Sequence, residues 1–343
     1  MQDHKKKAKY YLWPAAISML IIVSIIFYYF FCTFSKSNED QFVYIDGDDT
    51  PDSVYTKLAD IANSCQLAGF RTLARHYGYE KNIRTGRYLI TPGMNTFTVF
   101  RHMKNGHQQP MMLTIPEART TELLAGRLSQ KLMVDSTELV QALTSEEICE
   151  KYGYDTATIV AMFVPNTYEV YWDMTLEKLM QRMQKEHDAF WTDERQKKAQ
   201  KLGLTPNEVA TLASIVDEET ANTAEKPMIA GMYLNRLKTG MPLQADPTVK
   251  FALKDFNLKR IYHNHLSVES PYNTYAHIGL PPGPIKVASI KGIDAVLNRQ
   301  AHNYLYMCAN SDFSGTHVFA RNYQEHLHNA ALYAKALNER GIK

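Results

Sequence analysis

The chain has 343 residues, of which 45% are hydrophobic and 22% are charged, and its formal net charge is +2. This composition is typical of one or two globular domains, and it argues against a disordered tail. It also argues against a dedicated nucleic-acid binder, so we expect no nucleic-acid partner.

The N-terminal segment differs from the rest of the chain. Residues 11–34 contain no charged residue and are long enough to cross a bilayer as a helix. Lysines precede this segment and acids follow it, so the positive-inside rule places residues 1–10 in the cytoplasm and the remaining chain on the other side. No small-residue cleavage site follows the long apolar run, which favours a retained single-pass anchor over a cleaved signal peptide. The lysines are Lys5, Lys6, Lys7 and Lys9, and the acids are Glu39, Asp40, Asp46, Asp48 and Asp49.

Residues 35–41 have the composition of a short polar linker, and residues 42–115 have the pattern of a small α+β module. Alternating or continuous apolar runs predict strands at 42–45, 86–90 and 112–115. Helical periodicity predicts helices at 53–67, 70–77 and 96–104, the last of which ends at an Asn-Gly pair.

Residues 116–343 are expected to form a second, larger α+β domain. A helix is predicted at 120–132, and residues 135–205 are mainly helical and charged, including the long stretch 176–202. The final third is rich in aromatic and amide residues, and its proline-glycine run at 279–285 predicts a rigid loop. Such loops suit carbohydrate recognition, but they also suit ordinary loop packing.

The helix predicted to begin after Thr205 carries the most informative side chains. Thr205 and Glu208 have the spacing of a capping box, and Pro206 suits the first helical position. The apolar residues Val209, Leu212, Ala213 and Val216 then fall within one stripe of the helix, about 100° wide.

Three acids follow that stripe, and their positions around the helix differ. Glu219 lies about 60° from Val216, at the edge of the apolar stripe, whereas Asp217 lies about 100° away and Glu218 on the opposite side. A carboxyl in apolar surroundings stays protonated near neutral pH, so Glu219 is the candidate proton donor. From geometry alone, a carboxylate that reaches solvent at the end of the helix is an equally good interpretation.

Other constellations give weaker signals. His263-Asn264-His265 lacks the surroundings of a nuclease metal site, and no phosphate-binding loop or serine-nucleophile motif is present in the sequence. Cys65, Cys149 and Cys308 are widely spaced and odd in number, so at most one disulfide is expected. We therefore expect no metal and no cofactor. The remaining candidates for catalysis are the carboxyl groups of acidic side chains.

Five motifs occur in an order that resembles the MltG-type (YceG-like) endolytic murein transglycosylases. A Phe-Val-Pro-Asn-Thr-Tyr segment at 163–168, the N-terminal apolar helix and a LysM-like module agree with that family's layout. The motifs are Ala213-Ser-Ile-Val-Asp-Glu-Glu-Thr220, Tyr233-Leu-Asn-Arg-Leu237, Gly240-Met-Pro-Leu-Gln-Ala-Asp-Pro-Thr-Val249, Tyr272-Asn-Thr-Tyr275 and Gly279-Leu-Pro-Pro-Gly-Pro-Ile285.

This resemblance implies a lyase in the bacterial cell (inner) membrane whose periplasmic domain cuts MurNAc–GlcNAc bonds within peptidoglycan strands and leaves 1,6-anhydroMurNAc ends. It implies that Glu219, at the family's second acidic position, is catalytic, since Asp217 replaces the glutamate usual at the first. It also implies nascent glycan as substrate and peptidoglycan synthases as partners. The candidates for holding the strand or orienting the acid are Gln244, Asp246, Asn273 and Tyr275. A hydrolytic muramidase and a non-catalytic peptidoglycan-binding scaffold remain as alternatives.

Overall fold

The computed structural model describes residues 2–258 and 260–341, with side chains described from Trp13 onward. Met1 and the side chains of the N-terminal lysines, on which the predicted orientation depends, lie outside the described part of the chain. The structure is of the predicted mixed α+β class, and the chain divides into two compact units. The first unit holds residues 1–113 and 169–174, and the second holds 114–168 and 175–343.

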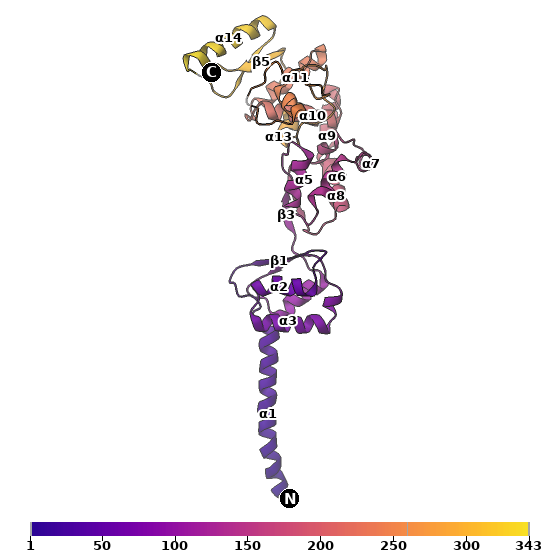
Figure 1. Ribbon diagram of the computed structural model, residues 1–343, viewed down its shortest axis with the longest axis vertical. Helices are drawn as coiled ribbons and strands as arrows, with labels where there is room; N and C mark the ends of the chain where they lie inside the picture. The colour runs from indigo at the N-terminus through magenta and orange to yellow at the C-terminus, as the bar shows by residue number, and fades with distance from the viewer. Residues whose placement is uncertain (1, 259, 342–343) are drawn as a thin grey trace. The chain divides into compact units, whose positions relative to one another are not determined.

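The first unit begins with the long helix α1 (Gln2–Phe31) and continues into a small α+β module (Figure 1). Strands β1 (Gln41–Ile45) and β2 (Gly86–Ile90) pair antiparallel, with Val43 opposite Tyr88. The predicted strands at these positions are therefore confirmed. The other elements of the module are α2 (Pro51–Ile61), α3 (Ser64–His76), the 3-10 helix η1 (Tyr79–Lys81) and α4 (Thr96–Asn105).

Residues Trp13–Phe31 of α1 form a 19-residue stretch that is long and apolar enough to cross a membrane. The end of this helix packs on α3 and α4. The Gln66 amide donates a hydrogen bond to the Tyr28 carbonyl (2.9 Å), and the Thr96 hydroxyl donates one to the Tyr29 carbonyl (2.8 Å). Both carbonyls belong to the last turn of α1, where no partner exists within the helix.

The predicted helices 53–67 and 70–77 are wrong in their boundaries. The break lies at Ala62, which is extended and forms an isolated β-bridge with Ser35, and Asn63 then precedes α3. Gly69 lies inside α3, where the sequence suggested a break. A Cβ atom at Gly69 would lie 2.6 Å from the Tyr29 carbonyl oxygen, so a tertiary contact explains this glycine.

Residues before β1 also belong to the first unit. The Phe34 side chain is fully buried in the core of the module, and Ser35 is buried beside it. The predicted linker at 35–41 thus begins at a residue that is bridged to Ala62.

The second unit is mainly helical up to the helix that carries the candidate acid. The stretch predicted as helical at 176–202 is two helices, separated at Trp191 and Thr192, and the Thr192 hydroxyl accepts a hydrogen bond at the start of the second. The chain passes between the two units at the paired strands β3 (Met111–Thr114) and β4 (Thr167–Val170). The helices are α5 (Thr121–Ser129), α6 (Ser136–Thr144), α7 (Glu146–Lys151), the 3-10 helix η2 (Ile159–Met162), α8 (Leu176–Phe190) and α9 (Asp193–Leu202).

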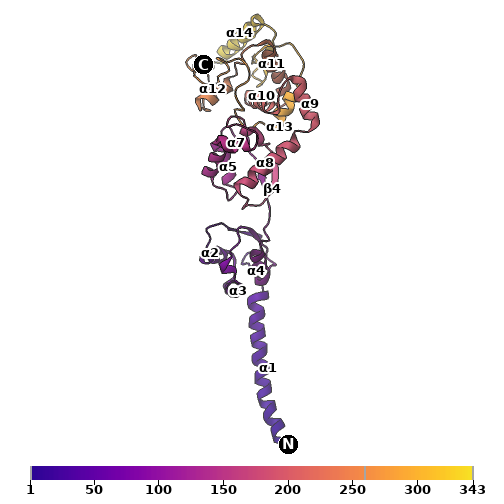
Figure 2. The same cartoon turned by 90° about the vertical axis from the view of Figure 1, so that its right-hand side faces the viewer.

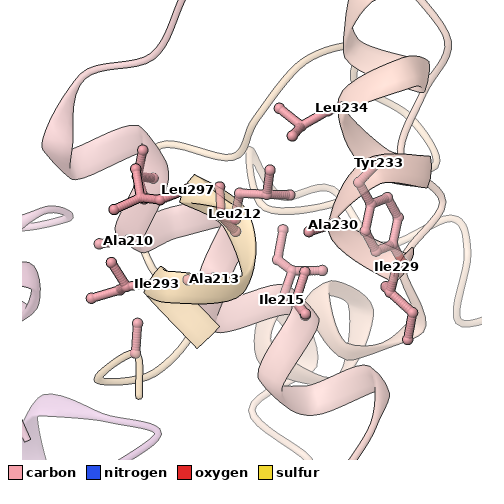
Figure 3. Close-up of a cluster of buried hydrophobic side chains, with 14 of the residues drawn as sticks. Ala210, Leu212, Ala213, Ile215, Ile229, Ala230, Tyr233, Leu234, Ile293 and Leu297 are labelled. Carbon is pink, nitrogen blue, oxygen red and sulfur yellow. The ribbon is translucent and has the colours of Figure 1, made fainter. Parts of the chain in front are cut away.

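Helix α10 (Pro206–Glu219) lies at the centre of the second unit's core. It packs against α11 (Lys226–Thr239) and α13 (Ile290–Leu297), and α10 and α13 lie side by side in both Figure 1 and Figure 2. Figure 3 shows Leu212 and Ile215 of α10 among aliphatic side chains of these two helices. All residues from Val209 to Val216 are buried, so α10 is enclosed on every side, whereas the sequence predicted one apolar stripe.

The last elements form a hairpin and a helix. Strands β5 (Tyr306–Ala309) and β6 (His317–Ala320) pair antiparallel, and α14 (Tyr323–Glu339) packs on both. The short helix α12 (Asp246–Leu253) follows α11 after a turn (Figure 2). The four cysteines, all within the described residues, are free thiols.

Candidate active site

Glu219 is the last residue of α10, and the start of that helix is as predicted. The Thr205 hydroxyl accepts a hydrogen bond from the Glu208 backbone N–H, and the Glu208 carboxylate accepts one from the Thr205 N–H, which completes the capping box. Because α10 is clamped by the core on every side, the position of Glu219 at its end is held by the whole domain.

The surroundings of Glu219 favour its protonated form. Burial raises the pKa of its carboxyl to about 7, against the effect of a hydrogen bond from Tyr233, which lowers it. The Tyr233 hydroxyl of α11 donates that bond to Glu219 Oε1 at 2.6 Å. Among the smaller influences, the Asp246 charge raises this pKa, and the charges of His317 and Lys250 lower it. The carboxyl therefore exchanges its proton near neutral pH.

Glu219 opens into a pocket of about 360 Å³. Three of the four predicted substrate-binding residues, Gln244, Asp246 and Tyr275, line this pocket with it. One side of the pocket comes from α10, α11 and the start of α12, and the other comes from the β5–β6 hairpin and α14. The remaining lining residues include Met232, Tyr233, Arg236, Leu243, Tyr306, Met307, Cys308, Ala309, His317, Tyr323 and His326.

Local backbone geometry places two of these side chains. Gln244 has a φ of 51°, a left-handed conformation unusual for a residue other than glycine, and its N–H donates to the Thr274 carbonyl. Asp246 begins α12, and its Oδ1 accepts a hydrogen bond from the Tyr275 hydroxyl at 2.6 Å. Burial and this carboxylate raise the pKa of Tyr275, which keeps its hydroxyl a donor.

The structure does not bring Asn273 to the pocket of Glu219. Its side chain is fully buried and donates hydrogen bonds to the carbonyls of Leu266 and Val268, both at 2.9 Å. Its Oδ1 accepts from the Tyr275 N–H. Asn273 thus braces the loop that presents Tyr275.

Sequence reasoning did not identify Arg236 as a site residue, although it belongs to one of the quoted motifs. Arg236 is buried, and its guanidinium donates to the carbonyls of Leu305 and Leu243 and to Gln244 Oε1. It therefore joins the turn before α12 to the start of the hairpin. The motif Tyr233-Leu-Asn-Arg236 was the signal that could have identified it.

A buried pair of Glu225 and His317 was also missed. The Glu225 carboxylate accepts hydrogen bonds from the backbone N–H of His317 (2.6 Å) and from its Nδ1 (3.0 Å). The His317 ring lines the pocket, and Nδ1 is committed to Glu225, so Nε2 is the ring nitrogen left to meet a ligand. The two residues are 92 positions apart, and no local pattern links them.

The two neighbouring acids have other partners. The Asp217 carboxylate, whose side chain is 1% exposed, binds Lys226 and accepts hydrogen bonds from the Ser289 backbone N–H and hydroxyl. Glu218 pairs with Arg119 at 2.7 Å and with Lys286 at 3.5 Å. Of the three acids, Glu219 is the one that lines the pocket of about 360 Å³.

Comparison with known proteins finds one family and relatives that share one name. The sequence profile of the YceG-like family matches residues 43–332. The endolytic murein transglycosylase of Bacillus subtilis is 27% identical over 280 residues, which is 77% of each chain. The enzyme of that name from Streptococcus pneumoniae serotype 2 is 26% identical over 317 residues, covering 80% of this chain and 56% of the relative.

A solved structure is also similar. The crystal structure of a YceG-like protein of Listeria monocytogenes matches 85% of this chain and 99% of its own length, with a TM-score of 0.55 and 26% identity. A similar fold has thus been seen in a crystal for most of this chain.

Proposed function

The chain belongs to the YceG-like family, and from that membership we propose that it is a membrane-anchored endolytic lytic transglycosylase of peptidoglycan. It is a lyase that cuts the MurNAc–GlcNAc bond within glycan strands. The observation that carries the proposal is a carboxyl with a pKa of about 7 in a pocket lined by four tyrosines and the amide of Gln244.

Glu219 is the general acid in this proposal. Its proton goes to the glycosidic oxygen as the bond from that oxygen to C1 of MurNAc breaks, and an oxocarbenium-like centre develops at C1. The resulting carboxylate then takes the proton of the MurNAc C6 hydroxyl while the C6 oxygen bonds to C1. The product is a 1,6-anhydroMurNAc end, Glu219 is protonated again, and no water is consumed.

A pKa near 7 suits both halves of this cycle, because one group must release a proton and later accept one. Tyr233 contributes by donating to Glu219 Oε1, which stabilises the carboxylate that exists between the two steps. Burial raises the pKa of Glu219 and so favours the return of the carboxylate to its protonated form.

The other predicted residues receive separate roles. Gln244 and the Asp246–Tyr275 pair line the pocket and are proposed to hold the sugar. Asn273 is proposed to act through the loop it braces, since its side chain is buried away from the pocket. Direct substrate binding by Asn273 stays a prediction.

The location follows from α1. An apolar helix of 19 residues supports a single-pass anchor in the bacterial inner membrane, with the N-terminus cytoplasmic and the catalytic domain periplasmic. The small module of the first unit is proposed to be LysM-like. An anchored enzyme meets nascent strands beside the peptidoglycan synthases, and cleavage there limits strand length.

Product analysis tests the proposal. The purified full chain in detergent, incubated with uncross-linked glycan strands, should release fragments with 1,6-anhydroMurNAc ends by mass spectrometry. Glu219→Gln should reduce the rate by roughly 10²–10⁴-fold. Glu138→Gln, a matched change of an exposed acid at the start of α6, should not.

Other outcomes identify the alternatives. Reducing ends that carry one added water would establish a hydrolytic muramidase instead. Binding without any cleavage by the unmodified chain would establish a scaffold, and equal cleavage by Glu219→Gln would remove Glu219 from the role of acid.

A further inference from the structure

A second pocket, of about 240 Å³, lies on the same unit as the pocket of Glu219. Its lining includes Arg119 just before α5 and Glu122 in its first turn. Phe251 and Lys254 at the end of α12 also line it, as does Tyr272, three residues before Tyr275. None of the roles proposed above uses this pocket.

Helix α12 connects the two pockets. Asp246, its first residue, lines the pocket of Glu219, and Lys254, which ends it, lines the second. Lys250, midway between them, lines a small depression of about 30 Å³ together with Pro247 and Glu218. Asp246 and Lys250 are four residues apart and share one face of α12, and Lys254 follows the last residue of the helix in a left-handed conformation. At a rise of about 1.5 Å per residue, the backbone positions of these three residues form a line about 12 Å long.

Three aromatic side chains line the second pocket. The rings of Phe251 and Tyr272 lie 4.7 Å apart between centroids, and Phe256 lies 6.4 Å from Phe251. The Arg119 guanidinium covers the Phe256 ring at 5.4 Å. Ring faces of this kind stack on the apolar faces of sugars and on apolar parts of peptides.

Some of the cationic side chains near this line have acidic partners, and others do not. Arg119 pairs with Glu218, and Lys286 pairs with Glu117 and Glu218. In the part of the chain that the structure describes, neither Lys250 nor Lys254 forms an ion pair within 4.0 Å. Glu122 also lines the pocket, and hydrogen bonds from its own N–H and from Thr120 lower its pKa, with a smaller effect of the Lys254 charge.

From this arrangement we infer that the glycan strand runs from Glu219 along α12 into the second pocket, where Lys254 binds a carboxylate of a peptide attached to the strand. The inference rests on the proposed function, since it names a further part of the same substrate. A strand cut internally must continue beyond the scissile bond, and a line about 12 Å long from Asp246 to Lys254 is of the order of one disaccharide. A free ammonium beside aromatic rings fits a ligand that is anionic at one end and apolar beside it.

The test compares strands that carry their peptides with strands from which an amidase has removed them. Binding is measured on the full chain in detergent with Glu219→Gln in the background, so that no cleavage occurs. Lys254 has a φ of 53°, a conformation that asparagine adopts readily, so Lys254→Asn removes the charge without adding backbone strain. Lys238→Asn, an exposed lysine at the end of α11, is the matched control.

Lys254→Asn should weaken binding of peptide-bearing strands by roughly three- to tenfold and leave little preference over stripped strands. Lys238→Asn should keep the preference. An unchanged preference in Lys254→Asn, or a chain with Glu219→Gln alone that binds both kinds of strand equally, would overturn the inference.

Failure of the inference is distinguishable from failure of the proposed function. If the chain with Glu219 intact forms anhydro ends while Lys254→Asn keeps the peptide preference, the inference alone fails. If the chain forms no anhydro ends from either kind of strand, the proposed function fails, whatever Lys254 does.

Discussion

At the scale of single residues, Glu219 shows how two opposing effects bring the pKa of a carboxyl close to neutral pH. Burial raises its pKa, and the hydrogen bond from Tyr233 lowers it, with a result of about 7. Without the hydrogen bond the pKa would lie higher, and without burial it would lie lower, whereas the proposed reaction needs a group that both gives and accepts a proton.

Tyr233→Phe removes the donor and keeps the ring. Because the hydrogen bond stabilises the carboxylate, its loss should raise the pKa of Glu219, and the alkaline limb of kcat/KM against pH should move upward. A hydrogen bond to a charged group is worth about 1.5–3 kcal/mol, which corresponds to about one to two pH units. Tyr306→Phe, a change in the same pocket at a hydroxyl that takes no part in the hydrogen bond between Tyr233 and Glu219, is the control. An alkaline limb that does not move would contradict this account.

The raised pKa also has a consequence for stability. Burial raises the pKa of Glu219 from 4.5 to about 7, so between these values the folded state holds a proton that the unfolded state has released. The folded state therefore loses relative stability as the pH rises through this window. A difference of about 2.5 in pKa corresponds to roughly 3 kcal/mol.

Glu219→Gln lacks this titration, so its free energy of unfolding relative to the unmodified chain should increase between pH 4.5 and pH 7, by at most roughly 3 kcal/mol. Urea titrations at several pH values, followed by hydrogen exchange of the α10 amides, measure the difference. A difference that stays constant over this range would mean that Glu219 titrates normally.

Part of this candidate site could be predicted from the sequence. The helix angle left Glu219 as one of two equally good interpretations, and the family resemblance then favoured it and supplied Gln244, Asp246 and Tyr275, which line the same pocket. Glu225 and His317 could not be predicted, because their pairing depends on how α11 and β6 meet in space.

At the scale of elements, a buried cluster of Asp217, Ser289 and Lys226 connects the end of α10 to α13; this cluster is called the joint below. Asp217 accepts hydrogen bonds from the N–H and hydroxyl of Ser289, and the same hydroxyl accepts from the Gly292 N–H at the start of α13. Lys226 at the start of α11 supplies the opposite charge. The joint thus connects three helices two residues before Glu219.

Gly292→Ala should break this joint. A Cβ atom at Gly292 would lie 2.5 Å from Asp217 Oδ1, and the buried carboxylate has no room to move without losing its partners. We expect a loss of about 1–3 kcal/mol in the free energy of unfolding, with a lower kcat/KM. Urea unfolding and the rate of strand cleavage measure the two effects.

Gly126→Ala is the matched control, since a Cβ at this position of α5 meets nothing within 4 Å. It should stabilise the chain by about 0.5–1 kcal/mol, as expected for alanine in a helix. Equal effects of the two substitutions would mean that the joint at Gly292 is not tight.

Helix and strand types followed from periodicity and capping, but several boundaries did not. The break at Ala62 depends on a bridge to Ser35, and the helical Gly69 depends on the approach of the Tyr29 carbonyl. Both are contacts with residues more than twenty positions away, which a sequence window does not contain. The enclosure of α10 on all sides was missed for the same reason.

At the scale of the whole molecule, α1 carries apolar surface that the described protein leaves uncovered. Ile22 is 57% exposed and Ile25 is 52% exposed, and most large apolar side chains along this helix are similarly open. The stretch Trp13–Phe31 of 19 residues corresponds to about 28 Å of helix, close to the thickness of a bilayer's hydrocarbon core. Such a surface is compatible with a single-pass membrane anchor, which is the location proposed for this helix.

Ile22→Asp combined with Ile25→Asp should therefore release the chain from the membrane while leaving its chemistry intact. Each aspartate near the centre of a membrane helix costs roughly 2.5–3.5 kcal/mol of insertion free energy. Fractionation should find the double variant largely outside the membrane fraction, whereas Ile22→Leu combined with Ile25→Leu should remain in it. Both purified proteins should still form anhydro ends from isolated strands, because the proposed acid and its pocket lie in the second unit. A double aspartate variant that stays in the membrane fraction would mean that α1 is not the anchor. One that leaves the membrane and also loses cleavage of isolated strands would mean that anchoring and catalysis are not separable.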